Sequence, residues 1–202
     1  MKLLVLLSGV WAVLALARLY LNVKGYGKRI LYSKAAGDPG KGVAYAFTKA
    51  MVPWAKESVR MNMLSYALGM SFHAGVFTAF GLLLAALADL GIPAPLLLLA
   101  RLLTLAGAIG GFSLLGKRAV KAELRGLSCP DDFISNLLCS LFIALALGWT
   151  FDPSLAGIWM GEASLLLLYL PLGKIRHCCF FFTTRYHLGA FFGRRGTFPP
   201  QA

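Results

Sequence analysis

Two histidines lie in or beside apolar stretches of this sequence, where an imidazole can ligate a metal, carry a proton or form hydrogen bonds. His73 lies inside "MSFHAGVFTAFG", and His177 lies in "PLGKIRHCCFFF". A ligating or ionisable side chain inside a membrane segment is costly, so it marks a candidate functional site. Two imidazoles from different helices at similar depth suit the axial positions of a b-type haem. A proton relay and a hydrogen-bonded packing role remain alternatives for each ring.

The composition of the chain argues against an ordinary soluble domain. Of its 202 residues, 58% are hydrophobic and only 14% are charged, and the mean hydropathy is +0.72. A soluble globule of this size needs more polar surface, so the composition predicts the lipid bilayer as solvent. The four cysteines form no CxxC pair, which argues against a thiolate metal site and gives no disulfide framework. For the vicinal pair Cys178 and Cys179, apolar packing is favoured over redox chemistry.

The apolar stretches predict an all-α membrane protein with five transmembrane helices. Each stretch is long enough to cross about 30 Å of hydrocarbon at a rise of about 1.5 Å per residue. The sequence "GIPAP" predicts a tight turn between the second and third helices, and "FDPS" predicts another between the fourth and fifth. We expect one integral-membrane domain over 1–202, with spans at about 3–23, 61–90, 94–115, 133–150 and 155–190, the last including a cytoplasmic extension.

The basic residues predict the orientation of these helices. Seventeen of the twenty Lys and Arg lie in the segments 24–60, 117–125 and 174–195, which an alternating topology places on one side. The residues that fall on the opposite side are Lys2, Asp89 and Asp152. By the positive-inside rule, the N-terminus lies outside and the C-terminus lies in the cytoplasm, with the protein in the inner (cytoplasmic) membrane. The net charge of +12 is then a topology signal, and no nucleic-acid partner is expected.

The first span has an alternative interpretation as a secretory signal. Its sequence "MKLLVLLSGVWAVLALA" has a lone Lys, an apolar core and a small-x-small end. Cleavage would leave the eight cations of 24–60 outside, against the charge bias, so we expect a retained span.

The segment 24–60 is a cytoplasmic connector with two interpretations. Its first part is rich in glycine, and its second part, "VAYAFTKAMVPWAKESVR", mixes apolar and basic residues. Such a stretch suits an amphipathic segment that lies on anionic lipid headgroups. It also suits a docking surface for a cytoplasmic partner, and the two interpretations are compatible.

Helical rise places the two imidazoles at similar depth in the membrane. Counted from Leu90, His73 lies about 26 Å down, and His177 lies about 28 Å down when counted from Ile158. Two histidines supply too few ligands for a zinc site. Small residues that would let a flat macrocycle approach, or would serve helix packing, are Gly69 and Gly75. Cations placed to meet haem propionates, or to anchor the helix at the surface, are Lys174, Arg176 and Arg185.

Three motifs in order resemble the cytochrome b (gamma) subunit of respiratory nitrate reductase. Its superfamily also includes the membrane cytochromes of heterodisulfide reductase and of sulfate-reducer redox complexes. "LPLGKIRHCCFFFTTRYH…GRR" is similar to the end of that family's last helix, "MNMLSYALGMSFHAGVF" to its second helix, and "RGLSCPDDFISNLL" to the start of its fourth. The likeness covers residues 61 to about 195, with the same five spans and orientation. It implies that His73 and His177 ligate the haem nearest the cytoplasm.

The resemblance also implies a single haem b and a function. Two-haem members carry further outer histidines on the second and fifth helices, where this chain reads "FGLLLAALA" and "GIWMGEASL". The implied function is that of a membrane-anchor subunit of an anaerobic respiratory oxidoreductase. It would transfer electrons between menaquinone and a cytoplasmic iron–sulfur subunit, with other membrane subunits as further partners. The alternative is a haem-free structural anchor or small transporter subunit, whose histidines serve packing or a proton relay.

Two further candidates follow from the charged and ligating residues that remain. Glu162 is a candidate for quinone and proton chemistry inside the spans, with Arg101 near it in the same role. A salt bridge between these two side chains is the structural alternative. His187 lies ten residues beyond His177, about 15 Å along a continuous helix, which is too far to share its iron.

Overall fold

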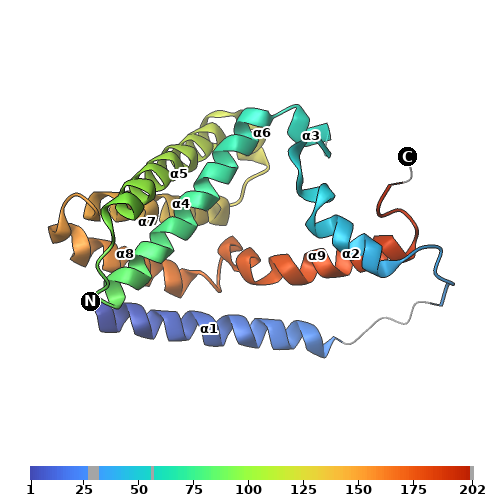
Figure 1. The fold of residues 1–202 in the computed structure, drawn as a ribbon, viewed down its shortest axis with the longest axis horizontal. Coiled ribbons are helices and arrows are strands. Elements are labelled where there is room, and N and C mark those ends of the chain that lie inside the picture. Colours follow the sequence, from blue (N-terminus) through green and yellow to red (C-terminus); the bar gives the residue numbers. More distant parts are fainter. Residues whose placement is uncertain (27–31, 56, 201–202) are drawn as a thin grey trace. The chain divides into compact units, whose positions relative to one another are not determined.

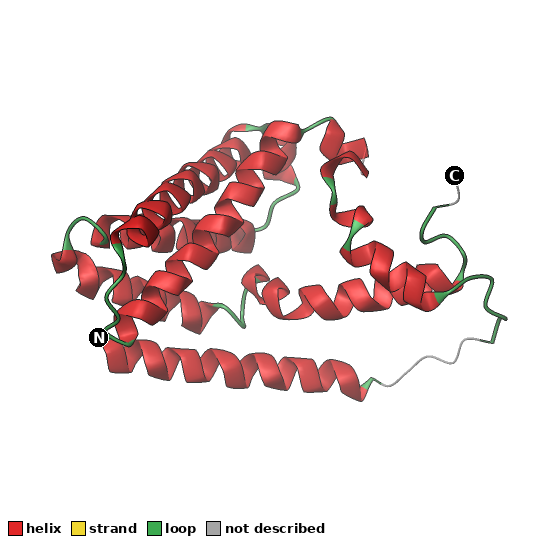
Figure 2. Cartoon of the chain, in the orientation of Figure 1, coloured by secondary structure: helices red, strands yellow, loops and turns green. Residues whose placement is uncertain are grey.

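Helices make up most of this protein, whose computed structural model describes residues 1–26, 32–55 and 57–200. Figure 2 shows them joined by loops, with no strand in these described ranges. The α-helices are α1 (Lys2–Gly25), α2 (Pro39–Phe47), α3 (Glu57–Arg60), α4 (Met63–Leu87), α5 (Ala94–Val120), α6 (Ala122–Gly126), α7 (Pro130–Trp149), α8 (Ala156–Tyr169) and α9 (His177–Arg194) (Figure 1). The short 3₁₀ helices are η1 (Lys49–Met51), η2 (Pro53–Ala55), η3 (Pro153–Leu155) and η4 (Lys174–Arg176).

Four helices, α1, α4, α5 and α7, are long and apolar enough to cross a membrane. In the most apolar 18-residue window of each helix, at most 33% is buried inside the protein. Most of the apolar surface of these helices is therefore uncovered and needs an apolar solvent. The pair formed by α8 and α9 makes a fifth candidate if it is one broken span. The protein is therefore an all-α, multi-pass membrane protein, as the sequence predicted.

Contacts divide the chain into two compact units, where the sequence predicted one domain. The first unit contains Met1–Ala15 and Leu64–Ile175, and the second contains Leu16–Met63 and Arg176–Ala202. The first unit thus holds the start of α1 together with α4 to α8, and the second holds α2, α3 and α9.

Polar contacts at the helix ends of the first unit agree with the predicted alternation of the spans. Lys2 Nζ lies 2.6 Å from Asp89 Oδ1, so the start of α1 lies beside the end of α4. At the other end of α4, Lys117 Nζ donates a hydrogen bond to Ser65 Oγ, which joins the end of α5 to the start of α4. These contacts confirm that Lys2 and Asp89 share one side of the bundle and that Lys117 lies on the other.

Glycine allows α4 and α5 to approach with their backbones in contact. A Cβ placed on Gly75 would lie 2.7 Å from the Cα of Gly107, and one on Gly110 would lie 2.6 Å from the carbonyl oxygen of Leu68. Side-chain carbons do not come this close to backbone atoms, so both positions require glycine. Small residues at such crossings are the usual means by which membrane helices associate, since lipid gives no hydrophobic drive between them.

An aromatic cluster forms the centre of the first unit, between α4, α7 and α8. Phe142 and Trp159 are completely buried. The ring of Phe142 lies 4.8 Å from that of Phe80 and 6.2 Å from that of Trp159, which in turn stacks on Trp149 at 4.7 Å. Offset and tilted rings at these separations are favourable beyond the area that they bury. The cluster therefore fixes the relative positions of the three helices.

The last predicted span, at about 155–190 with its cytoplasmic extension, is bent by 75° at a break and is not one continuous helix. α8 ends at Tyr169, before η4 and α9 begin. Pro171 lacks a backbone N–H and disfavours helical geometry in the residue before it. A turn closes the break, with the Gly173 N–H donating to the Tyr169 carbonyl at 3.1 Å. The depth of His177, which we counted along an unbroken helix, therefore no longer applies.

In the second unit, α2 of the connector packs against α9. A Cβ on Gly189 would lie 2.6 Å from the Cα of Val43, and one on Gly193 would lie 2.8 Å from the Cα of Gly42. Asp38 caps α2 by accepting hydrogen bonds from N–H groups of its first turn. Part of the connector thus binds this chain's own C-terminal helix, which neither interpretation of the sequence included. The connector cations that lie outside the described residues are Lys28, Arg29 and Lys56.

The close contact of α4 with α5 gives a stability prediction. We expect Gly75→Val and Gly107→Val each to destabilise the full-length protein by about 1–3 kcal/mol, the usual cost of overpacking. The matched control is Gly81→Val on α4, because a Cβ at Gly81 has no neighbour within 4 Å in the described chain. Melting temperatures in detergent measure the difference. Equal melting temperatures for Gly107→Val and Gly81→Val would contradict the packing.

Candidate functional site

The imidazole of His73 is held in one orientation on α4. Its Nδ1 lies 2.7 Å from the carbonyl oxygen of Gly69, one turn earlier. A carbonyl oxygen only accepts hydrogen bonds, so Nδ1 carries the proton and Nε2 carries the lone pair. The residue is exposed rather than buried in the aromatic core of the first unit. The hydrogen bond to Gly69 thus limits the orientation of the imidazole on its helix.

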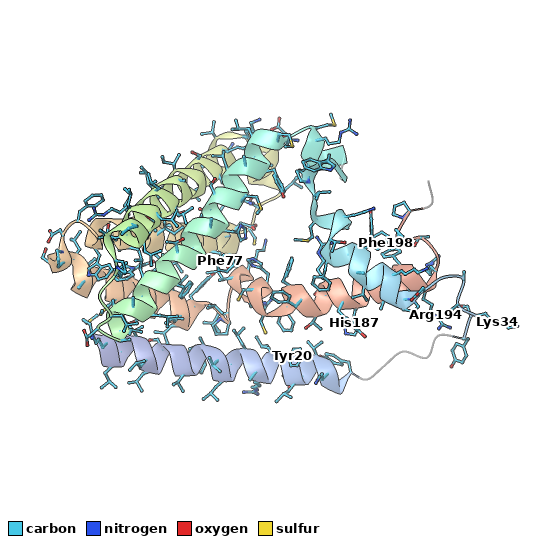
Figure 3. All side chains as sticks on the ribbon, viewed as in Figure 1. Tyr20, Lys34, Phe77, His187, Arg194 and Phe198 are labelled. Carbon is cyan, nitrogen blue, oxygen red and sulfur yellow. The ribbon has the colours of Figure 1, made fainter. Side chains whose placement is uncertain are left out.

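The surroundings of His73 are apolar and leave room on the same helix face. A Cβ added to Gly69 would meet no atom within 4 Å in the described chain. Met70 and Phe77, about one turn before and after His73 on α4, are both exposed, and Phe77, labelled in Figure 3, is 72% exposed. Gly75, by contrast, is buried against Gly107, so it serves helix packing, the alternative that the sequence left open. Of the two glycines, Gly69 is the one whose surroundings within the described chain are open.

His177 is the first residue of α9 and is also exposed. It belongs to the second unit, whereas His73 belongs to the first. The pairing of these two imidazoles therefore stays a prediction from the sequence.

The cations on either side of His177 differ in their contacts. Lys174 Nζ forms an ion pair with Asp132 Oδ1 at 2.7 Å, so the contact observed for this ammonium group is with a carboxylate of α7. Arg176 is exposed and occupies the N-cap position of α9, where its side chain makes no capping hydrogen bond. Arg185, further along α9, donates to Met51 Sδ at 2.8 Å and lies over the ring of Phe181. Arg176 is thus the cation of this group for which no side-chain contact is described.

Asp131 and Asp132, at the start of α7, form a carboxylate cluster whose role the sequence analysis missed. Asp131 accepts hydrogen bonds from the Tyr169 hydroxyl at 2.5 Å, from Ser135 Oγ at 2.8 Å and from the Lys174 backbone N–H at 2.9 Å. The bonds from Tyr169 and Lys174 tie the break after α8 to the first turn of α7, whereas the Ser135 bond lies within α7. Two acidic residues directly after Pro130 indicate a helix start, where carboxylates are favourable. Which distant groups they bind is visible only in the fold.

Glu162 and Arg101 do not form the salt bridge that was the structural alternative. Arg101 donates from Nε to Thr150 Oγ1 at 3.1 Å and from its terminal nitrogen to the Thr150 carbonyl, and it lies over the ring of Phe151 at 4.0 Å. It therefore closes the C-terminal end of α7. Glu162, on α8, has a buried Oε1 without a hydrogen-bond partner among the described residues. The roles of Glu162 and Arg101 in quinone or proton chemistry stay predictions from the sequence.

His187 lies ten residues after His177 on the same helix, α9. At helical rise this separation is about 15 Å, so the two rings cannot share one iron. Its ring has an edge contact with that of Tyr186 at 5.5 Å. Within the described part of the chain, no group of three or more His, Cys, Asp or Glu side chains is arranged to hold a metal ion.

No protein-family model, curated protein or solved structure matches this chain. The resemblance carried by the three sequence motifs is therefore the basis on which a family is proposed below.

The carboxylate cluster at the start of α7 gives a prediction about the break before His177. Asp131→Ala removes three hydrogen bonds, and bonds to a charged group contribute about 1.5–3 kcal/mol each. We expect amide hydrogen exchange in the segment 169–175, measured by mass spectrometry, to accelerate about ten- to hundredfold. The control is Asp152→Ala, which removes a carboxylate cap from the turn at η3. Unchanged exchange at 169–175 in Asp131→Ala would show that the cluster does not hold the break.

Proposed function

We propose that this protein is a haem b membrane-anchor subunit of an anaerobic respiratory oxidoreductase. It would transfer electrons between menaquinone and a cytoplasmic iron–sulfur subunit, in the inner (cytoplasmic) membrane. His73 and His177 would be the two axial ligands. The observation that carries the proposal is the His73 ring, which lies in an apolar span and donates from Nδ1 to the Gly69 carbonyl, so that Nε2 would be the nitrogen that ligates the iron.

The positions of the two imidazoles support a ligand role more than a packing role. Both His73 and His177 are exposed, and neither belongs to the buried core of the chain. A packing histidine in a membrane protein is expected to be enclosed by neighbouring helices and hydrogen-bonded across them. A ligand has to present one nitrogen beyond its own helix while the other nitrogen is anchored, and the Nδ1 bond of His73 is such an anchor.

The number of histidines supports one haem. The chain has three, and His187 is about 15 Å beyond His177 along α9, so only one bis-histidine pair can form. A haem bound there supplies one-electron redox chemistry, with its potential set by ligand type and burial. The apolar residues Met70 and Phe77 would exclude water from its face. Arg176 would meet a propionate, because Lys174 is already paired with Asp132.

The resemblance to the nitrate reductase gamma-subunit superfamily supplies the rest of the proposal. It implies a quinone as substrate, an iron–sulfur protein as partner and the orientation of the helices in the membrane. The basic segments follow the positive-inside pattern of a cytoplasmic membrane, which agrees with a partner on the cytoplasmic side. Glu162 is the candidate proton acceptor for quinol oxidation, because its buried Oε1 has no hydrogen-bond partner among the described residues.

The ligand assignment predicts a visible spectrum. Purified full-length protein should give a reduced-minus-oxidised α band at the b-type position, and the band should be lost in His73→Ala and in His177→Ala. His187→Ala is the matched control and should keep the band. A folded but colourless protein would contradict the proposal and favour the haem-free anchor or transporter. A band that survives both ligand substitutions would contradict the assignment of His73 and His177 as ligands.

The role of Glu162 is tested by the rate at which menaquinol reduces the haem of the purified protein. Loss of a positioned proton acceptor typically costs about 10²–10⁴-fold, so Glu162→Gln should slow quinol-driven reduction by that order while leaving dithionite reduction unchanged. Glu123→Gln, at an exposed carboxylate of α6, is the control. A normal rate in Glu162→Gln would assign this residue a structural role.

A further inference from the structure

A cavity of about 320 Å³ lies in the second unit, where the loop before α2 meets the end of α9. Its lining residues are Ser33, Lys34, Ala36, Phe191, Arg194 and Arg195. Figure 3 shows Lys34 and Arg194 near one another at this end of α9. The volume is at the lower end of the range for small-molecule sites, so it suits a small group rather than a whole cofactor.

The walls of the cavity are fixed by backbone contacts. The N–H groups of Ala36 and Gly37 donate to the carbonyl of Arg194 at 2.9 and 3.0 Å, and the Arg194 guanidinium donates in return to the carbonyl of Ser33. A Cβ on Gly196 would lie 3.1 Å from the Ala36 carbonyl oxygen. The loop and the helix end are therefore held together before any ligand arrives, which reduces the entropy that binding has to overcome.

The chemistry of the lining is cationic. Three of its six side chains, Lys34, Arg194 and Arg195, carry positive charge, and no carboxylate is among the six. Arg194 Nε is buried and has no hydrogen-bond acceptor among the described residues. A buried donor of this kind is costly unless an acceptor reaches it. The lining thus carries three positive charges and no carboxylate to balance them, a composition that suits an anionic, oxygen-bearing group.

We propose that this cavity binds the phosphate of an anionic phospholipid headgroup. Guanidinium groups suit phosphate because their planar donors match its oxygens. Phe191, which is 41% exposed, lines the same cavity and gives the lipid's glycerol and acyl side an apolar surface. Basic clusters beside membrane helices on the cytoplasmic side bind anionic lipids in this way. A soluble phosphate could use the same donors, so the test separates the two sources.

The test uses purified full-length protein in detergent, with phosphatidylglycerol, phosphatidylcholine or inorganic phosphate as separate probes. Binding is followed by native mass spectrometry of the intact protein. The double variant Lys34→Gln/Arg195→Gln should bind its tightest phosphatidylglycerol about 30-fold more weakly, because each cation near a membrane contributes about fivefold. Its matched control is Lys41→Gln/Lys49→Gln, which removes the same charge from exposed positions of the second unit outside the cavity.

Three outcomes decide the proposal. Loss of phosphatidylglycerol binding in the cavity variant but not in the control, with little binding of phosphatidylcholine, supports it. If the cavity variant binds phosphatidylglycerol as tightly as the control does, the cavity is not the binding site and the proposal is overturned. Tight binding of inorganic phosphate without preference for phosphatidylglycerol overturns the lipid assignment. Arg194→Lys, which keeps the charge but loses the buried Nε–H, should show an intermediate loss.

Discussion

The contact of backbone with backbone at Gly75 and Gly107 is the constraint on which the first unit depends. In lipid, apolar side chains gain little by leaving the solvent for another helix, so association has to come from close packing. With these glycines in contact, α4 and α5 present matched surfaces to α7, and the aromatic cluster around Phe142 fills the remaining volume. The same device recurs in the second unit, where Gly42 and Gly193 bring α2 against α9. In both units, therefore, glycines let two helices approach with their backbones in contact.

Close packing also requires that polar groups in the spans be satisfied locally. Thr104, buried in α5, donates to the carbonyl of Ala100 at 2.7 Å, and Ser164, buried in α8, donates to that of Met160 at 2.8 Å. Such bonds within one helix remove the cost of a hydroxyl in an apolar medium without using a neighbouring helix. Arg101 of α5 is different, because it donates to the Thr150 carbonyl at the end of a neighbouring helix, α7, where a carbonyl needs a donor. Against this background, the buried Glu162 oxygen without a partner among the described residues stands out as a functional candidate.

The sequence predicts what depends on local composition and misses what depends on distant contacts. Hydropathy placed the spans at 61–90 and 94–115, close to the observed α4 and α5, because the cost of exposing polar backbone in lipid is set by each segment alone. The break after Tyr169 was missed, although Pro171 was the signal, because a proline in an apolar stretch predicts either a kink or an end. The bonds of Asp131 join groups about 40 residues apart, and no periodicity reveals them.

The two candidate sites share a physical logic that follows from this packing. Where helices touch, the chain uses glycine and buried aromatic rings and leaves no space for a ligand. The imidazole of His73 is anchored by a carbonyl of its own helix, that of Gly69, whereas the guanidinium of Arg194 on α9 is anchored by the carbonyl of Ser33 in the loop before α2. In both cases a hydrogen bond to a backbone carbonyl limits the orientations open to the polar group. Such orientation is the property on which both proposals draw, iron porphyrin for the imidazole and phosphate for the guanidinium.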